Sequence, residues 1–158
     1  MKPRNNIELG PLRIEDPVKL TQLSLRAKQS WGYSGQFMSN CEELLGFDAS
    51  PFEHPENLCI VARNPSRIAG FATLIKTSLR VTELDDFFVD PVFQGFGVGK
   101  QLFHAVADAA RTQGMSLIEI TSDPFAEGFY ASMGCYRVGY SKASAVENRL
   151  LPVLNLLL

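Results

Sequence analysis

The sequence predicts an α/β domain of the α+β kind, with a mixed, mostly antiparallel sheet of six to seven strands and about four helices on both faces. The chain has 158 residues, which suits a single domain spanning 1–158 and leaves little room for a second. Strand patterns at 58–63 and 67–76 flank a proline-containing turn, which indicates a hairpin and antiparallel pairing. A helical pattern at 99–111 lies between strand patterns at 81–89 and 117–121, which indicates a parallel pair.

The first third of the chain predicts one strand and two helices. An apolar stretch at 7–14 is typical of a strand, and the helix after it is expected to begin with Asp16 as its cap. Residues 30–37 are predicted to form a loop. Ser39 and Glu42 then fit a capping box, which predicts a second, short helix beginning there.

The last third predicts a further helix and two strands. Asp123, followed by proline, is expected to cap a helix that ends at Gly134. Residues 136–140 form another strand pattern. The apolar stretch 150–158 is expected to be the last strand, which either completes the sheet or pairs with another subunit.

Composition excludes several classes of protein. Apolar residues make up 46% and charged residues 20%, which is typical of a soluble globular protein, and the net charge of −2 gives no sign of a nucleic-acid partner. Three cysteines without a CxxC pair predict neither a disulfide framework nor a metal site. The polar start of the chain and the lack of a long apolar segment predict a cytoplasmic protein with no membrane partner. The sequence does not choose between a monomer and a homodimer.

A glycine-rich segment between the strand at 81–89 and the next helix carries the strongest chemical signal. Glycines let the backbone turn tightly, and the first N–H groups of a helix, at the positive end of its dipole, bind anions. Two common phosphate loops are excluded: GxGxxG would need glycine at Lys100, and a Walker A loop would need Ser or Thr at Gln101. The segment reads Gln94-Gly95-Phe96-Gly97-Val98-Gly99-Lys100.

The spacing of Gln94, Gly97 and Gly99 fits Q/R-x-x-G-x-G/A, and in this respect the chain resembles the GNAT superfamily of N-acetyltransferases. The segment from Tyr130 to Gly134 is similar to the Tyr-x-x-x-Gly segment of that family. The order of elements is similar along nearly the whole chain. The resemblance implies a GNAT-like fold and an enzyme that transfers an acetyl group from acetyl-CoA (coenzyme A) to an amine.

The resemblance also implies how the cofactor is held. Main-chain groups of the strand end at 87–89 would pair with the pantetheine arm, and the amides of 95–100 would surround the pyrophosphate. Asp123 stands where the family often has an asparagine that contacts the cofactor, but Asp cannot donate as Asn does, which favours helix capping. The expected cofactor-binding residues are Phe87, Phe88, Val89, Gln94, Gly95, Phe96, Gly97, Val98, Gly99, Lys100, Asp123 and Phe125.

Tyr130 is the expected general acid. Acetyl transfer to an amine needs a neutral amine, a polarised thioester oxygen and a proton for the departing thiolate. A phenol has an ordinary pKa of about 10, close to that of a thiol, so it can supply that proton. The resemblance implies this role for Tyr130, while packing in an aromatic core is the alternative.

The base is expected to be Glu83 or water. Glu83 lies eleven residues before Gln94, the offset at which histone-type members of the family carry a glutamate base that usually acts through water. Strand alternation places Glu83 and Asp85 on one side of the strand and Asp86 on the other. These acids could instead bind a cationic substrate, and Asp85 is the candidate for that. Glu119 is a third candidate base.

Trp31 and Tyr33 are the expected acceptor-binding residues, because they stand beside glycines in the loop at 30–37 and could stack on a substrate. The expected acceptor is the primary amine of a small or amino-acid-like molecule. A protein lysine or N-terminal acetyltransferase is an alternative, and so is a module that binds acyl-CoA without turnover. The sequence does not choose among these acceptors.

Overall fold

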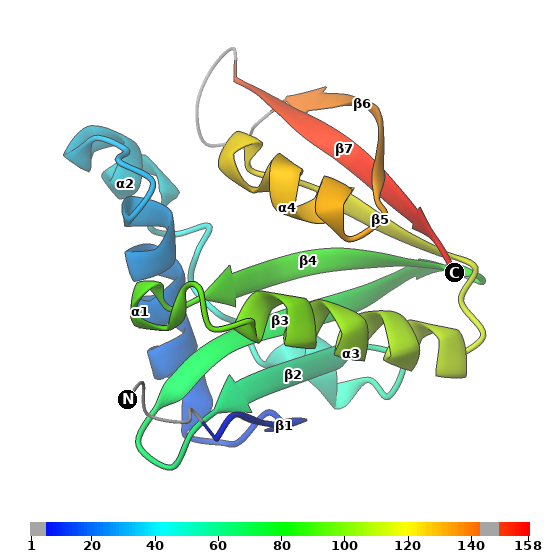
Figure 1. The fold of residues 1–158 in the computed structure, drawn as a ribbon, viewed down its shortest axis with the longest axis horizontal. Helices are drawn as coiled ribbons and strands as arrows, with labels where there is room; N and C mark the ends of the chain where they lie inside the picture. Colours follow the sequence, from blue (N-terminus) through cyan, green and yellow to red (C-terminus); the bar gives the residue numbers. More distant parts are fainter. Residues whose placement is uncertain (1–5, 143–148) are drawn as a thin grey trace.

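The computed structural model describes residues 6–142 and 149–158. Seven strands form one sheet in the order β1-β2-β3-β4-β5-β7-β6 (Figure 1). The strands are β1 (Glu8–Pro11), β2 (Leu58–Arg63), β3 (Ile68–Ser78), β4 (Val81–Val89), β5 (Leu117–Thr121), β6 (Tyr136–Lys142) and β7 (Leu150–Leu157). The helices are α1 (Asp16–Gln29), α2 (Gly35–Cys41), α3 (Val98–Thr112) and α4 (Glu127–Ser132), with 3₁₀ turns η1 (Ser50–Glu53), η2 (Pro91–Phe93) and η3 (Pro124–Ala126).

The sheet is antiparallel except where β4 meets β5, which confirms the predicted fold class. The parallel ladder joins only 81–84 of β4 to 117–120 of β5. Beyond it, β4 continues to Val89 with β3 as its only partner among the described strands, and Figure 1 shows β4 and β5 diverging. The sheet therefore opens at its middle.

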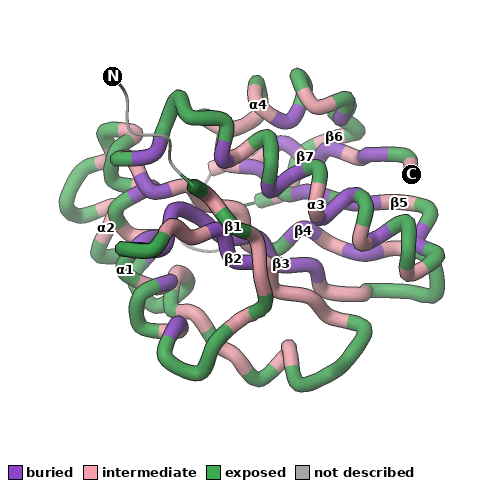
Figure 2. The backbone as a smooth tube through the Cα atoms, turned by 60° about the horizontal axis from the view of Figure 1, so that its bottom comes forward, coloured by how far each residue is buried: buried purple, intermediate pink, exposed green. Residues whose placement is uncertain are grey.

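Each face of the sheet carries its own core, which confirms the prediction of helices on both faces. On one face, Leu102 and Val106 of α3 pack with strand residues such as Leu74, and Tyr130 of α4 joins the same cluster. On the other face, Leu20 of α1 packs with Phe71 of β3. Figure 2 shows the buried stretch at the centre of the sheet, and β3 is buried continuously from Ile68 to Leu74 because helices cover it on both sides.

The prediction that Asp16 caps α1 was wrong. Asp16 lies inside the first turn, is fully buried, and pairs with Arg63 of β2 at 2.7 Å. The Asp16 carboxylate accepts hydrogen bonds from Arg63, which is 47 residues away in the sequence, and does not cap the helix. The capping box at Ser39 was also wrong: α2 begins at Gly35, and the hydroxyl of Ser34 accepts from the N–H of Phe37 at 3.2 Å.

The C-terminal strand completes the sheet. β7 lies between β5 and β6 and is antiparallel to both. This confirms the first of the two expectations for 150–158. Within the described residues, no helix combines the length and apolar character that a membrane span needs.

Candidate active site

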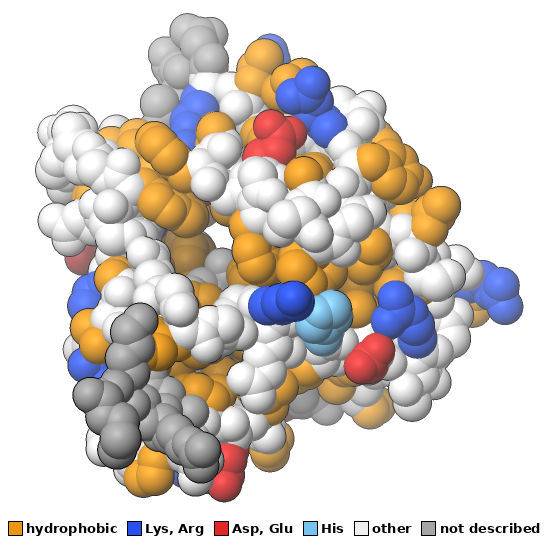
Figure 3. Space-filling view, in the orientation of Figure 1, with side chains coloured by type: hydrophobic (Ala, Val, Ile, Leu, Met, Phe, Trp, Pro, Cys, Tyr) orange, Lys and Arg blue, Asp and Glu red, His pale blue; other side chains and the backbone are white. Residues whose placement is uncertain are grey.

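Two adjoining cavities occupy the opening between β4 and β5. The larger has a volume of about 300 Å³ and the smaller about 150 Å³. Figure 3 shows a deep hollow between the side of the molecule that carries α1 and the side that carries α4, bordered by hydrophobic side chains. The residues common to both cavities are Trp31, Phe87, Phe88, Ala126 and Tyr130. Because they share these walls, the two cavities form one cleft.

The larger cavity reaches the start of α3, where the backbone is shaped by glycine. Gly95 and Gly97 have φ values of +82° and +79°, a region that residues with a Cβ rarely adopt. Gly97 is the N-cap residue of α3. The first hydrogen bond of the helix runs from the N–H of Gln101 to the carbonyl oxygen of Gly97, at 3.0 Å. The N–H groups of 98–100 therefore have no acceptor within the helix and lie at its positive end. Gln94 and Gly99 line this cavity.

Asp90 fixes the turn that leads into this segment. Its carboxylate accepts from the N–H of Val92 at 3.1 Å and from Arg26 and Arg67 at 2.8 Å each. Burial alone would raise the pKa of Asp90, but these hydrogen bonds outweigh it and hold the pKa below its usual range. Because Arg26 belongs to α1 and Arg67 precedes β3, Asp90 ties the turn to α1 and to the start of β3.

β4 has a bulge where it enters the cleft. Asp85 and Asp86 lie together opposite the single residue Thr73, whose hydroxyl accepts from Asp86 N at 2.8 Å and donates to the Asp86 carboxylate at 3.2 Å. Thr73 pairs with Cys59, which belongs to the core on the α1 side. The prediction that Asp86 faces away from Glu83 was therefore wrong, since a bulge interrupts the alternation on which it rested. Asp85 is exposed and lines the smaller cavity.

The acidic side chains of this region hold their protons more strongly than usual. Burial, followed by the charges of Asp85 and Glu119, raises the pKa of Glu83. Burial raises the pKa of Asp85, and burial with the nearby Asp85 raises the pKa of Asp86 to about 6. Glu83 is half-buried and pairs with Glu119 across the parallel ladder, but it is not among the residues that line the two cavities. Any action of Glu83 on a substrate in the cleft therefore requires an intermediary such as water.

Tyr130 stands where the two cavities meet. It projects from α4 into a group of aromatic rings, with ring centres 5.5 Å from Phe129, 5.8 Å from Phe87 and 6.2 Å from Phe103. Only 5% of the residue is exposed. Burial first, and then the neighbouring Cys135, Asp123 and Asp86, raise its pKa. The phenol therefore keeps its proton at neutral pH.

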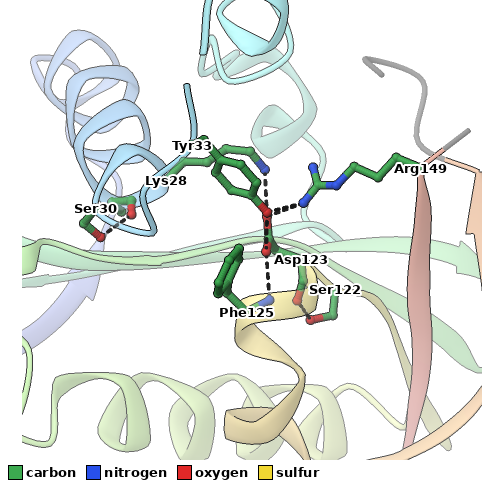
Figure 4. A network of polar contacts seen from close by, with 8 residues as sticks. Lys28, Ser30, Tyr33, Ser122, Asp123, Phe125 and Arg149 are labelled. Atoms are coloured by element: carbon green, nitrogen blue, oxygen red, sulfur yellow. Dashed lines mark hydrogen bonds and ion pairs between the residues drawn. The ribbon is translucent and has the colours of Figure 1, made fainter. Parts of the chain in front are cut away.

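Asp123 caps η3 and is the centre of a polar network on the smaller cavity (Figure 4). It accepts from the N–H of Phe125 at 2.9 Å, which confirms the capping role. The same carboxylate accepts from Lys28 at 3.1 Å, from the Tyr33 hydroxyl at 2.9 Å and from Arg149 at 3.1 Å. Although burial opposes it, the bonds from Phe125 and Lys28 hold the pKa of Asp123 below its usual range. A cofactor contact by Asp123 stays a prediction.

The two predicted acceptor residues differ in place and contacts, because Tyr33 is not among the residues that line the two cavities. Trp31 lines both cavities and stacks on Phe125, with ring centres 6.0 Å apart. Tyr33 stacks on Phe37 at 4.0 Å and its hydroxyl also bonds to Arg149. Tyr33 therefore acts first as a member of the Asp123 network, and a direct contact between Tyr33 and a substrate stays a prediction.

Lys28 and Arg149 were not predicted. Lys28 lies near the end of α1, and Arg149 comes just before β7. Lys28 shares the last turn of α1 with Arg26, which pairs elsewhere, and the common partner of Lys28 and Arg149 is 95 and 26 residues away respectively. No local pattern marks them. Among the described residues, no cluster of three or more His, Cys, Asp or Glu side chains could hold a metal ion.

Comparison with known proteins identifies the family. Residues 37–146 match the acetyltransferase (GNAT) domain, which is more than two thirds of the chain. The chain belongs to this family, and the predicted resemblance is confirmed.

Two curated relatives match parts of the chain. One is an uncharacterized ycf52-like N-acetyltransferase of Prochlorococcus marinus, 32% identical over 68 residues, which cover 43% of this chain and 38% of the relative. The other is the N-alpha-acetyltransferase RimI of Mycobacterium tuberculosis, 34% identical over 89 residues, which cover 54% of this chain and 56% of the relative. The matched parts thus span about half or less of each relative's length.

Solved structures show the same fold at low sequence identity. The PaiA N-acetyltransferase of Thermoplasma acidophilum, in complex with coenzyme A, has a TM-score of 0.77 at 16% identity, covering 96% of this chain and 99% of that one. The ribosomal-protein-S18-alanine N-acetyltransferase of Escherichia coli has a TM-score of 0.70 at 18% identity, covering 96% and 93%.

Proposed function

We propose that this protein transfers the acetyl group of acetyl-CoA to the primary amine of a small or amino-acid-like acceptor. The observation that carries the proposal is the opening of the sheet between β4 and β5. It brings the glycine-shaped start of α3 to one end of a cleft and acidic and basic side chains to the other, with Tyr130 between them. Membership of the acetyltransferase (GNAT) family supports both the reaction and the cofactor.

The larger cavity fits coenzyme A. The side of β4 that leaves β5 offers main-chain groups of 87–89, which can pair with an extended arm as a neighbouring strand would. The N–H groups of 98–100 can donate hydrogen bonds to the pyrophosphate, and Gln94 and Gly99 line the cavity. When bound, acetyl-CoA supplies an activated acetyl thioester.

Tyr130 acts as the general acid of this chain. Its hydroxyl keeps a proton at neutral pH and stands at the junction of the two cavities, where a departing thiolate would need one. The apolar rings around Tyr130 disfavour any charged form, so they raise the pKa of a thiol as well as that of the phenol. The two groups stay matched for proton transfer.

Glu83, or a water molecule beside it, acts as the base. The raised pKa of Glu83 makes its carboxylate a better proton acceptor than an ordinary glutamate. Asp85 lines the smaller cavity and attracts the cationic form of an amine before it loses its proton. Trp31 and Leu151 form other parts of the cavity wall and help to exclude bulk water.

A protein acceptor is the second candidate. The observation that favours it is the 34% identity to an N-alpha-acetyltransferase over 89 residues. The volume of the smaller cavity, about 150 Å³, favours instead a small amine or a single side chain.

The test is a thiol-release assay with acetyl-CoA and a panel of amino acids, polyamines and N-terminal peptides. Release that depends on a small amine supports the proposal, and release only with peptides favours the second candidate. Tight binding of acetyl-CoA without release on any acceptor would indicate a non-catalytic acyl-CoA-binding module and contradict the proposed reaction.

A further inference from the structure

The polar network around Asp123 carries an excess of positive charge. One carboxylate pairs with two cations, Lys28 and Arg149, each at 3.1 Å. The side chains of Lys28 and Arg149 are only 14% and 17% exposed, so water screens their charges weakly. In the described part of the chain, Asp123 is the one carboxylate with which either cation forms an ion pair.

Both cations are held in place by aromatic rings. The guanidinium of Arg149 lies 4.9 Å from the ring centre of Tyr33 and 4.7 Å from that of Phe37, while Lys28 lies 5.6 Å and 5.7 Å from the same rings. Arg149 makes its hydrogen bonds through Nη2, and a guanidinium carries further donors on Nη1 and Nε. The pair is preorganised, and its donors exceed what one carboxylate accepts.

Lys28 of this positive pair lies at the acceptor end of the cleft. Lys28 and Asp123 line the smaller cavity and not the larger one, and Arg149, which is not among the lining residues, joins this end through its ion pair with Asp123. Asp85 lines the same small cavity from β4. One cavity of about 150 Å³ therefore has an acidic part at Asp85, suited to an amine, and adjoins the network of Lys28, Asp123 and Arg149, whose net positive charge suits an anion.

We propose that the acceptor carries a carboxylate beside its reacting amine, and that Lys28 and Arg149 recognise this carboxylate. This inference rests on the proposed function and narrows its substrate class to amino acids and related zwitterions. Asp123 positions both cations through their shared ion pairs, and the hydroxyl of Tyr33 completes the network.

The experiment compares acceptors that differ only in the carboxylate. The wild-type chain is assayed with acetyl-CoA and a panel of L-amino acids and β-alanine, each paired with its carboxamide. Values of kcat/KM are expressed per neutral amine, because the amide lowers the pKa of a nearby amino group. We expect the best acceptor to exceed its amide by about tenfold or more, the factor that corresponds to one charge-assisted hydrogen bond.

Variants assign that preference to residues. Lys28→Met and Arg149→Met are each expected to lower the acid-to-amide ratio at least about fivefold, with acetyl-CoA affinity unchanged. Lys19→Met is the matched control, since it removes the same charge from an exposed position of the same helix. Melting temperatures show which variants are folded, and the wild-type ratio tests the proposal without any variant.

The outcomes separate this inference from the proposed function. Equal use of acid and amide by the wild-type chain would overturn the inference and leave acetyl transfer standing. A ratio that survives in both folded variants would overturn it too, as would a loss of acetyl-CoA affinity with an unchanged ratio, because the cations would then serve the cofactor. No transfer to any acceptor would overturn the proposed function and this inference together.

Discussion

The two ends of the cleft are built in different ways. In the larger cavity, the features suited to the cofactor belong to the main chain of a single stretch: the side of β4 that leaves β5, two glycines with positive φ, and the first turn of α3. Side chains from other segments, such as Trp31 and Phe129, complete its walls. The smaller cavity depends on side chains that come from α1, β4, η3 and the segment before β7. A change at one end should therefore act through the local backbone, and a change at the other through a network that crosses the fold.

This difference suggests how one scaffold can keep a cofactor and vary its acceptor. Main-chain donors do not depend on the identity of side chains, so the anion-binding turn before α3 needs glycines that permit its backbone shape and no particular side chain. The smaller cavity is defined by a few charges, of which Lys28, Asp85 and Asp123 line it directly. Changing one of these would alter acceptor preference and leave the cofactor end intact. Variants at each end test whether cofactor binding and acceptor preference are independent.

Tyr130 joins the two ends, and Tyr130→Phe should have the largest effect. The change removes the phenolic proton and keeps the aromatic packing against Phe87 and Phe129. We expect kcat to fall by about 10²- to 10⁴-fold, the range for loss of a general acid, with acetyl-CoA affinity unchanged. Steady-state kinetics and calorimetry measure the two quantities. Tyr136→Phe, at an exposed position of β6, is the control, and an unchanged kcat in Tyr130→Phe would remove the acid assignment.

Gly97→Asp should affect the cofactor end alone. A side chain at Gly97 meets nothing within 4 Å, but its carboxylate would lie at the anion-binding start of α3. We expect acetyl-CoA affinity to fall by about 100-fold or more, because like charges would meet at short range. Calorimetric titration measures this.

Gly114→Asp controls for backbone strain in that experiment. Gly114 has nearly the same φ, +78°, follows the far end of α3 and also has open space around it. Its affinity for acetyl-CoA should match the wild-type value. Equal losses in the two variants would mean that strain, and not charge at the start of α3, weakens binding.

Gly70→Ala should disturb both ends at once. A Cβ at Gly70 would lie 2.7 Å from the carbonyl oxygen of Phe88, which lines both cavities, and 3.0 Å from Leu102 of α3. We expect a loss of about 1–3 kcal/mol in the free energy of unfolding, typical of overpacking. Chemical denaturation compares it with Gly139→Ala, a strand glycine with open space around it. Equal stability of the two variants would contradict the close approach of β3 to β4.

The pH dependence of kcat/KM should identify the base, with the smallest expected effect. Glu83 must lose its proton to act, and its pKa is raised, so kcat/KM per neutral amine should fall as pH drops through a value above about 4.3, the ordinary glutamate pKa. Glu83→Gln should abolish this acidic limb, whereas Glu119→Gln should keep it. If the acidic limb persists in Glu83→Gln, another group is responsible for it, and Asp85 is the first candidate.

The parts of the molecule that sequence predicted are those set by neighbouring residues. The predicted bounds of β2, β4 and β5 agree with the structure because each contains several apolar strand-forming residues and ends at turn residues. Asp123 caps η3 as expected, since the Asp-Pro pair acts over two residues. The glycine-rich segment was found for the same reason, and its family assignment was confirmed.

The parts that sequence missed depend on contacts between distant segments. The prediction that Asp16 caps a helix was wrong because its carboxylate pairs with Arg63, 47 residues away. The predicted orientation of Asp86 was wrong because β4 has a bulge opposite Thr73 of β3, and a bulge depends on how the two strands pair. The sequence did not predict a role for Lys28 or Arg149 for the same reason. Only the fold brings the two cations to one carboxylate.

A titration of the full chain with acetyl-CoA by calorimetry, with ATP and NADH run alongside, tests the central claim most directly. The cleft between β4 and β5 predicts one acetyl-CoA bound per chain and no comparable signal from the other two ligands. A signal with ATP or NADH but none with acetyl-CoA would contradict the assignment of the cleft, and with it the proposed reaction.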